Sequence, residues 1–126
     1  MATASKIYDP GNVFARILRG EIPCRKVYED DHVLAFHDVN PQAPIHVLVI
    51  PKGAYVSWDD FSATASDAEI AAFVRATGTI ARELGANEKG YRVLANTGAD
   101  GGQEVPHFHL HLFAGRPLGR MVAKPS

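Results

Sequence analysis

Histidine alternates with large apolar residues between positions 107 and 113, in the stretch His-Phe-His-Leu-His-Leu-Phe. Successive side chains of a β-strand point to opposite faces of a sheet, so this pattern predicts a strand with His107, His109 and His111 on one face. The intervening apolar residues suit the core side. Each buried imidazole needs a hydrogen-bond partner, and neighbouring rings disfavour one another's protonated forms. Such a row therefore favours a functional role.

Four further runs have the pattern of β-strands. Positions 46–50 are apolar almost throughout, which is typical of a central strand buried on both faces. The polar residues 30–32 have hairpin character and separate two shorter runs. The predicted strands cover residues 26–29, 33–37, 46–50, 91–96 and 107–113.

Two segments have helical periodicity. Residues 66–69 read Ser-Asp-Ala-Glu, the form of a capping box, and the apolar spacing after them predicts one long helix that stops at Gly85. Gly78 within it indicates close packing against the sheet. Asn12 can cap a short helix that Gly20 ends. The segments expected to lack regular structure are 1–11, 55–64 and the glycine-rich 97–106.

Composition restricts the class of protein. The chain has 126 residues, enough for one domain, with thirteen basic and fourteen acidic residues and a formal net charge of −1. This balance argues against nucleic-acid binding through a global basic field. Cys24 is the only cysteine, which fits a reducing compartment, by default the cytoplasm. No apolar run suits a signal peptide or approaches the roughly 20 residues of a membrane span, so we expect a soluble protein without a membrane partner.

The histidine row allows three interpretations. One is a metal site, because imidazole is a common zinc ligand, although only Glu104 offers a nearby carboxylate in the sequence. The favoured one is nucleophilic catalysis at phosphorus, because imidazole attacks phosphoryl centres and leaves again from the phosphoramidate. Backbone N–H groups of the 97–102 loop would then bind phosphate oxygens. The third is a set of structural histidines in a binding module.

The stretch 107–113 resembles the His-φ-His-φ-His-φ-φ signature of the histidine triad (HIT) superfamily, and the wider sequence is similar to its nucleotide-binding branch. The resemblance covers residues 12–119, which we take as one domain between an N-terminal arm (1–11) and a C-terminal tail (120–126). It implies an α+β fold with a five-stranded antiparallel sheet, one long helix and one short helix. It also implies a homodimer whose two sheets join into one of ten strands. The supporting segments are 13–14, 20–23, 34–38, 40–44, 46–52, 96–98 and 101–103.

This resemblance implies a purine nucleotidyl hydrolase. Its substrates would be AMP-type phosphoramidates, cleaved at the P–N bond, or acyl-adenylates, and the intermediate would be a covalent nucleotidyl-histidine. His109 would be the nucleophile and His111 would contact the phosphate, while His46 and His107 would supply a supporting hydrogen-bond network. Asp38 would bind the ribose. The other residues implied to bind nucleotide are Val13, Phe14, Ile22 and Phe36 around the base, Asn96 beside the phosphate and leaving group, and His37, Asn40, Gly102, Gln103, Glu104 and Val105.

Four positions depart from the family pattern. Many bacterial relatives have a zinc-binding Cys-x-x-Cys pair where this chain has Asn12 and Ala15, so we expect no metal and no cofactor. Glu104 stands where the best-studied branch has a serine that assists the leaving group, and Pro106 where many relatives have an aromatic residue. Both changes bear on rate and leaving-group preference. The alternatives are a metal-dependent hydrolase that uses the histidine row and a non-catalytic purine-nucleotide-binding module.

Overall fold

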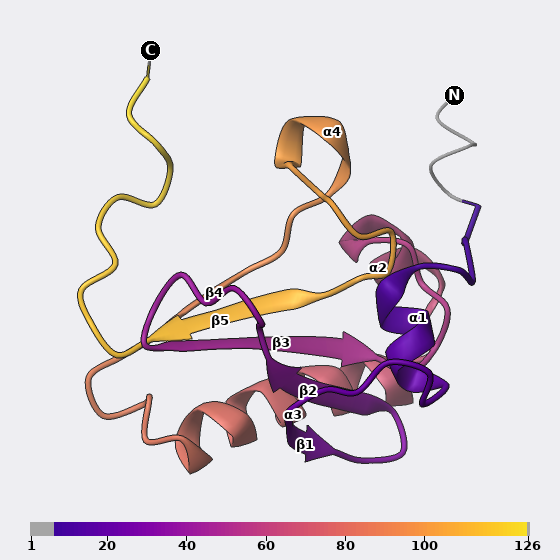
Figure 1. The fold of residues 1–126 in the computed structure, drawn as a ribbon, viewed down its shortest axis with the longest axis horizontal. Coiled ribbons are helices and arrows are strands. Elements are labelled where there is room, and N and C mark those ends of the chain that lie inside the picture. Colours follow the sequence, from indigo (N-terminus) through magenta and orange to yellow (C-terminus); the bar gives the residue numbers. More distant parts are fainter. Residues whose placement is uncertain (1–6, 126) are drawn as a thin grey trace.

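A five-stranded antiparallel sheet organises the computed structural model, which describes residues 7–125 (Figure 1). Its spatial order is β1-β2-β3-β5-β4, and each neighbouring pair is antiparallel. The α+β class and the five-stranded antiparallel sheet are therefore confirmed. The strands are β1 (Lys26–Glu29), β2 (Val33–His37), β3 (Ile45–Pro51), β4 (Arg92–Leu94) and β5 (Leu110–Ala114).

Both predicted helices are present, and the residues that cap their N-termini are those predicted from the sequence. The Asn12 side chain accepts a hydrogen bond at the start of the short helix. Ser66 and Glu69 form the reciprocal capping box of the long one. Among residues 7–125, no helix combines the length and apolarity that crossing a membrane requires. The helices are α1 (Val13–Leu18), α2 (Trp58–Thr64), α3 (Asp67–Glu83) and α4 (Gly98–Gly101).

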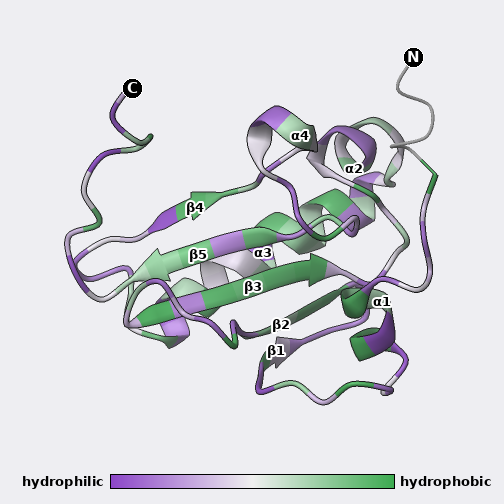
Figure 2. Ribbon diagram, turned by 45° about the horizontal axis from the view of Figure 1, so that its top comes forward, coloured by the Kyte–Doolittle hydropathy of each residue, from purple (hydrophilic) through white to green (hydrophobic). Residues whose placement is uncertain are grey.

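The central strands are buried on both faces and separate two apolar clusters. In β3, Val47 and Val49 belong to the larger cluster, which includes residues of α2 and α3, whereas Leu48 belongs to a smaller cluster with Phe14 of α1. Figure 2 shows β3 coloured as hydrophobic along most of its length. Alternation along one strand thus gives the sheet a core face toward α3 and a second face toward α1. The three triad histidines lie on the α1 side, and Phe108 lies in the larger cluster.

Two predicted irregular segments contain a helix. Within 97–106, residues 98–101 form α4, a single turn with no buried residue and therefore no apolar periodicity. Residues 58–64 form α2, and the Ser57 hydroxyl caps it by accepting a hydrogen bond from the Asp60 N–H at 3.3 Å. Asp59 and Asp60 in the first turn also favour a helix, because their charge complements the positive end of the helix dipole. The prediction is wrong because α2 is short and buries a single residue, Phe61, so its periodicity is weak.

Three further local predictions are also wrong. The strand predicted over 107–113 begins only at Leu110, and the one predicted over 91–96 spans three residues. Residues 107–109 lie ahead of β5, where the Phe108 N–H donates to the Tyr55 carbonyl at 2.7 Å. Gly78 does not mark contact with the sheet. The atom nearest to a Cβ there would be a guanidinium nitrogen of Arg82, 3.2 Å away.

Residues 1–6 of the predicted N-terminal arm and residue 126 of the predicted tail lie outside the described residues. The described part of the tail contacts the sheet edge. The Arg92 guanidinium of β4 donates to the carbonyls of Gly119 and Arg120 at 2.8 and 3.1 Å. The start of the tail is thereby attached to β4.

The larger cluster makes a prediction about stability. Phe108 is 1% exposed, and its ring lies 5.0 Å from those of Phe61 and Phe73. We expect Phe108→Ala to lower the free energy of unfolding by about 3–5 kcal/mol, because it removes a buried ring and leaves a cavity. The control is Val39→Ala in a loop where the side chain is 89% exposed. Urea titration followed by circular dichroism should separate the two variants, and equal losses would contradict the assigned core.

Candidate active site

A cavity of about 620 Å³ opens on the α1 side of the sheet, beside His109 and His111. A larger cavity of about 760 Å³ lies near Gly85–Gly90 and Ala114–Pro117, where no described histidine lines it. The smaller cavity is therefore the candidate site. The implied site residues that line it are Val13, Phe14, Ile22, Phe36, His37, Asp38, Asn40, Asn96, Gly102, Glu104, Val105, His109 and His111.

Three implied site residues do not line this cavity. His46 and His107 are buried and contact the lining histidines instead. The Gln103 amide donates to the carbonyls of Val56 and Val105 at 2.6 and 3.0 Å, so its side chain stabilises the glycine-rich loop. The lining residues that sequence reasoning did not single out are Ile17, Pro23, Cys24, Val39, Gln42 and Leu48.

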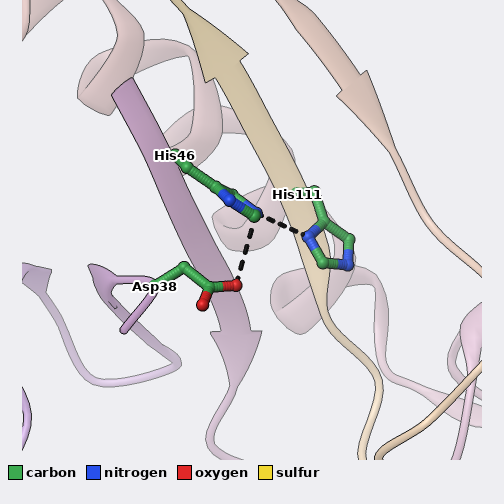
Figure 3. Close-up of side chains that lie close together, drawn as sticks. All are labelled: Asp38, His46 and His111. Carbon is green, nitrogen blue, oxygen red and sulfur yellow. Dashed lines mark hydrogen bonds and ion pairs between the residues drawn. The ribbon is translucent and has the colours of Figure 1, made fainter. Parts of the chain in front are cut away.

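A chain of hydrogen bonds fixes where His46 and His111 carry their protons. The Gln42 backbone N–H donates to His46 Nδ1 at 3.1 Å, so that nitrogen is unprotonated. The neutral ring carries its proton on Nε2, which lies 2.9 Å from His111 Nδ1 and 3.4 Å from Asp38 Oδ2 (Figure 3). His111 Nδ1 therefore accepts the hydrogen bond that the Nε2–H group of His46 donates. Neutral His111 therefore keeps its own N–H on Nε2, the nitrogen directed away from His46.

His109 has the opposite arrangement. Its Nδ1 lies 2.8 Å from the carbonyl oxygen of His107, and because a carbonyl only accepts, Nδ1 carries the proton. The lone pair of the neutral ring is then on Nε2. The rings of His109 and His111 are 5.1 Å apart. The two neighbouring rings therefore differ, because His109 offers a lone pair on Nε2 and His111 offers an N–H group on Nε2.

Burial keeps these rings neutral. It lowers the pKa of His107 to about 4, and together with the neighbouring rings of His109 and His46 it lowers the pKa of His111 to about 4. Burial also lowers the pKa of His109 and of His46, although the Asp38 carboxylate acts in the other direction on both. The tautomers assigned above are therefore those of uncharged rings at neutral pH.

Sequence reasoning did not identify the contact that Tyr8 makes with His107. The Tyr8 hydroxyl lies 2.7 Å from His107 Nδ1, while His107 Nε2 donates to the Pro51 carbonyl at 2.8 Å. Tyr8 therefore donates to Nδ1, and both ring nitrogens of this fully buried histidine are satisfied. No periodic pattern surrounds Tyr8, and the segment predicted as a loose arm is thus tied to the site at this residue.

The fold also brings a carboxylate, that of Asp38, close to His111, which lies far from it in the sequence. One ligand atom from each of Asp38, His46 and His111 lies within 4.8 Å of the others. However, the two imidazole nitrogens are 2.9 Å apart and share a proton. A tetrahedral zinc ion with Zn–N bonds of about 2.0–2.1 Å would hold them roughly 3.3 Å apart. A metal ion would therefore have to break this hydrogen bond.

Comparison with known proteins places the chain among relatives of similar length. The family profile described as "HIT domain" matches residues 19–118. A HIT-like protein of Azospirillum brasilense is 68% identical over 120 residues, covering 95% of this chain and 98% of the relative. The purine nucleoside phosphoramidase of Escherichia coli K12 is 46% identical over 111 residues, covering 88% of this chain and 92% of that enzyme.

Solved structures agree with this relationship. A histidine triad protein from Clostridium difficile has a TM-score of 0.80 and 44% identity, covering 92% of this chain and 100% of that one. A HIT family hydrolase from Clostridium thermocellum has a TM-score of 0.81 and 38% identity, with 90% and 97% covered.

The lowered histidine pKa values predict how stability depends on pH. The pKa of His107 is about 4 in the folded protein and about 6.5 when exposed, so the unfolded chain binds more protons between these values. We expect the contribution of His107 to the free energy of unfolding to be constant above about pH 7 and to fall as the pH drops from about 6.5 to about 4. His107 alone contributes a loss of about 2 kcal/mol between pH 7 and pH 5.

Urea unfolding at several pH values measures this slope. The slope should be shallower for His107→Gln, which removes a buried imidazole, and unchanged for His32→Gln, whose side chain lies exposed in the β1–β2 turn. A His107→Gln slope as steep as that of the wild type would show that buried His107 does not resist protonation.

Proposed function

This chain belongs to the HIT domain family, and on that premise we propose that it hydrolyses purine nucleotide derivatives, either AMP phosphoramidates at the P–N bond or acyl-adenylates. The phosphoramidase named above supports this class of reaction. The observation that carries the proposal is the free Nε2 lone pair of His109, beside a cavity that has both an apolar part and polar groups.

In the proposed reaction, His109 Nε2 attacks the phosphorus atom and the bond to the leaving group breaks. The leaving amine or carboxylate takes the bonding electron pair, and an amine also takes a proton from solvent. The imidazole becomes cationic as the P–N bond to His109 forms. The His107 carbonyl, which accepts from His109 Nδ1 at 2.8 Å, stabilises this charge. Water then attacks the nucleotidyl-histidine, releasing AMP and restoring neutral His109.

The cavity lining supports a purine nucleoside monophosphate as the bound group. Phe14 and Phe36, with ring centroids 5.6 Å apart, offer an apolar wall for the base together with Val13 and Ile22. The Asp38 carboxylate can accept from the ribose hydroxyls. His111 Nε2–H can donate to a phosphate oxygen without introducing a charge.

The leaving group is proposed to depart past Asn96, which lines the cavity, as does Glu104. The position of Glu104 supports a part in proton delivery or in the choice of leaving group. Lone Cys24 supports a cytoplasmic site of action.

A metal-dependent hydrolase is the second candidate, because Asp38, His46 and His111 lie close enough to hold an ion. The two candidates differ in their response to chelation. Activity that survives exhaustive treatment with a chelator supports the His109 mechanism. Stoichiometric bound metal, with activity lost on its removal, would favour the second candidate. A protein that binds AMP but hydrolyses no derivative would be a binding module.

We further propose a homodimer that pairs the β4 edges of two copies. β4 is the terminal strand of the sheet, and an edge strand presents unpaired backbone groups. Val93 on this strand and Tyr91 just before it are 44% and 41% exposed, and they line a cavity of about 590 Å³ together with Trp58 and Val74, which are 50% and 62% exposed. Antiparallel pairing of two β4 strands would make a ten-stranded sheet and cover these side chains.

The role of His109 has a direct test. We expect His109→Ala to reduce turnover of an adenosine 5′-phosphoramidate by at least about a thousandfold, because it removes the nucleophile. AMP binding measured by calorimetry should remain. Mass spectrometry of rapidly quenched wild-type protein should detect AMP attached to His109. His32→Ala is the control and should retain full activity. Unchanged hydrolysis in His109→Ala would exclude His109 as the nucleophile.

The dimer proposal is tested at the sheet edge. Val93→Lys places a charge at the centre of β4, so we expect light scattering to report a monomer where the wild type is a dimer. The control is Val122→Lys in the tail, where the side chain is 75% exposed. A monomeric wild type at micromolar concentration, or a dimeric Val93→Lys, would rule out pairing through β4.

A further inference from the structure

A second, smaller cavity adjoins the candidate active site. It has a volume of about 350 Å³, and Gln42, Asn96 and His111 line both cavities. His109 lines only the first cavity, as do Asp38 and Glu104. The nucleotide proposed above does not account for this space.

Two arginines give the second cavity its charge. Arg92 lies half-buried on β4 and Arg116 lies exposed after β5, and both line the cavity. Their guanidinium groups donate to backbone carbonyls, those of Gly119 and Arg120 for Arg92 and those of Gln42 and Pro117 for Arg116. Within residues 7–125 neither forms an ion pair with a carboxylate, and none of the described lining residues is acidic. The two charges are oriented but not neutralised.

The direction of the proposed reaction connects this cavity to the leaving group. In an in-line displacement the leaving group departs on the side of phosphorus opposite the nucleophile. A phosphoryl group held at His111 and attacked by His109 therefore expels its leaving group away from His109. Because His111 and Asn96 line both cavities, the second cavity is the one that can receive it.

We propose that the second cavity binds the leaving group, and that Arg92 and Arg116 select leaving groups that carry an anionic substituent such as a carboxylate. This inference rests on the hydrolase function proposed above and specifies its substrate class. A guanidinium group suits a carboxylate, because its N–H donors match the two oxygens. The preferred substrates are then AMP phosphoramidates of amino acids with a free carboxylate.

The experiment compares two substrates in each of several variants. The substrates are the adenosine 5′-phosphoramidates of glycine and of glycinamide, which differ by a carboxylate against an uncharged amide. The quantity measured is the ratio of their kcat/KM values. Differences in amine basicity cancel, because each variant's ratio is compared with that of the wild type.

We expect this ratio to fall about tenfold in Arg116→Gln and in Arg92→Gln, the effect of one partly exposed charge-assisted hydrogen bond. Arg116→Lys keeps the charge and should retain most of the preference. The control is Arg25→Gln, an exposed cation outside both cavities. It should leave the ratio unchanged.

The remaining outcomes overturn the inference in distinguishable ways. Equal losses for both substrates would mean that the arginines act on the phosphate or on the fold. An unchanged ratio in both glutamine variants would mean that they do not contact the leaving group. In either case the hydrolase function stands, because the wild type cleaves the glycinamide substrate. If wild-type protein cleaves neither substrate, the proposed cleavage of AMP phosphoramidates fails and the inference fails with it.

Discussion

Buried imidazoles are stable in this protein because each ring nitrogen that is closed off from water has a partner of the required kind. His107 lies between a hydroxyl that donates and a carbonyl that accepts, and His46 lies between a backbone N–H and another imidazole. No buried side-chain nitrogen or oxygen within residues 7–125 lacks a hydrogen-bond partner. These partners hold the rings neutral and set their tautomers, so the chemistry available to His109 and His111 follows from the packing around them.

That packing depends on a sheet with two apolar faces. α2 and α3 cover one face with the larger cluster, which leaves the other face to α1 and the histidines. The second face is only partly apolar, because His109 and His111 alternate with Phe108 and Leu112, which lie in the core, and His46 comes from the neighbouring strand β3. One short stretch of chain thus supplies the catalytic candidates and part of the core that immobilises them, which limits the freedom of both.

The two cavities beside His111 differ in charge. Carboxylates of Asp38 and Glu104 line the first, and guanidinium groups of Arg92 and Arg116 line the second. His111, whose pKa is lowered to about 4, lines both cavities. This difference in charge suits a substrate that has hydroxyl groups on one side of the phosphorus atom and an anionic group on the other.

The sequence alone determined the elements with strong local signals. The triad alternation placed the histidines on one face, and the Ser66 capping box placed the long helix, because both patterns depend on neighbours within a few positions. It missed α2 and α4, which bury one residue and none, and therefore show little apolar periodicity. Spacing alone could not distinguish His109 from His111. The tertiary structure did so, because their tautomers depend on the His107 carbonyl and on His46, and it also brought Tyr8 and Asp38 to the site across long stretches of chain. Contacts of this kind are set by the packing of the whole sheet and leave no local pattern in the sequence.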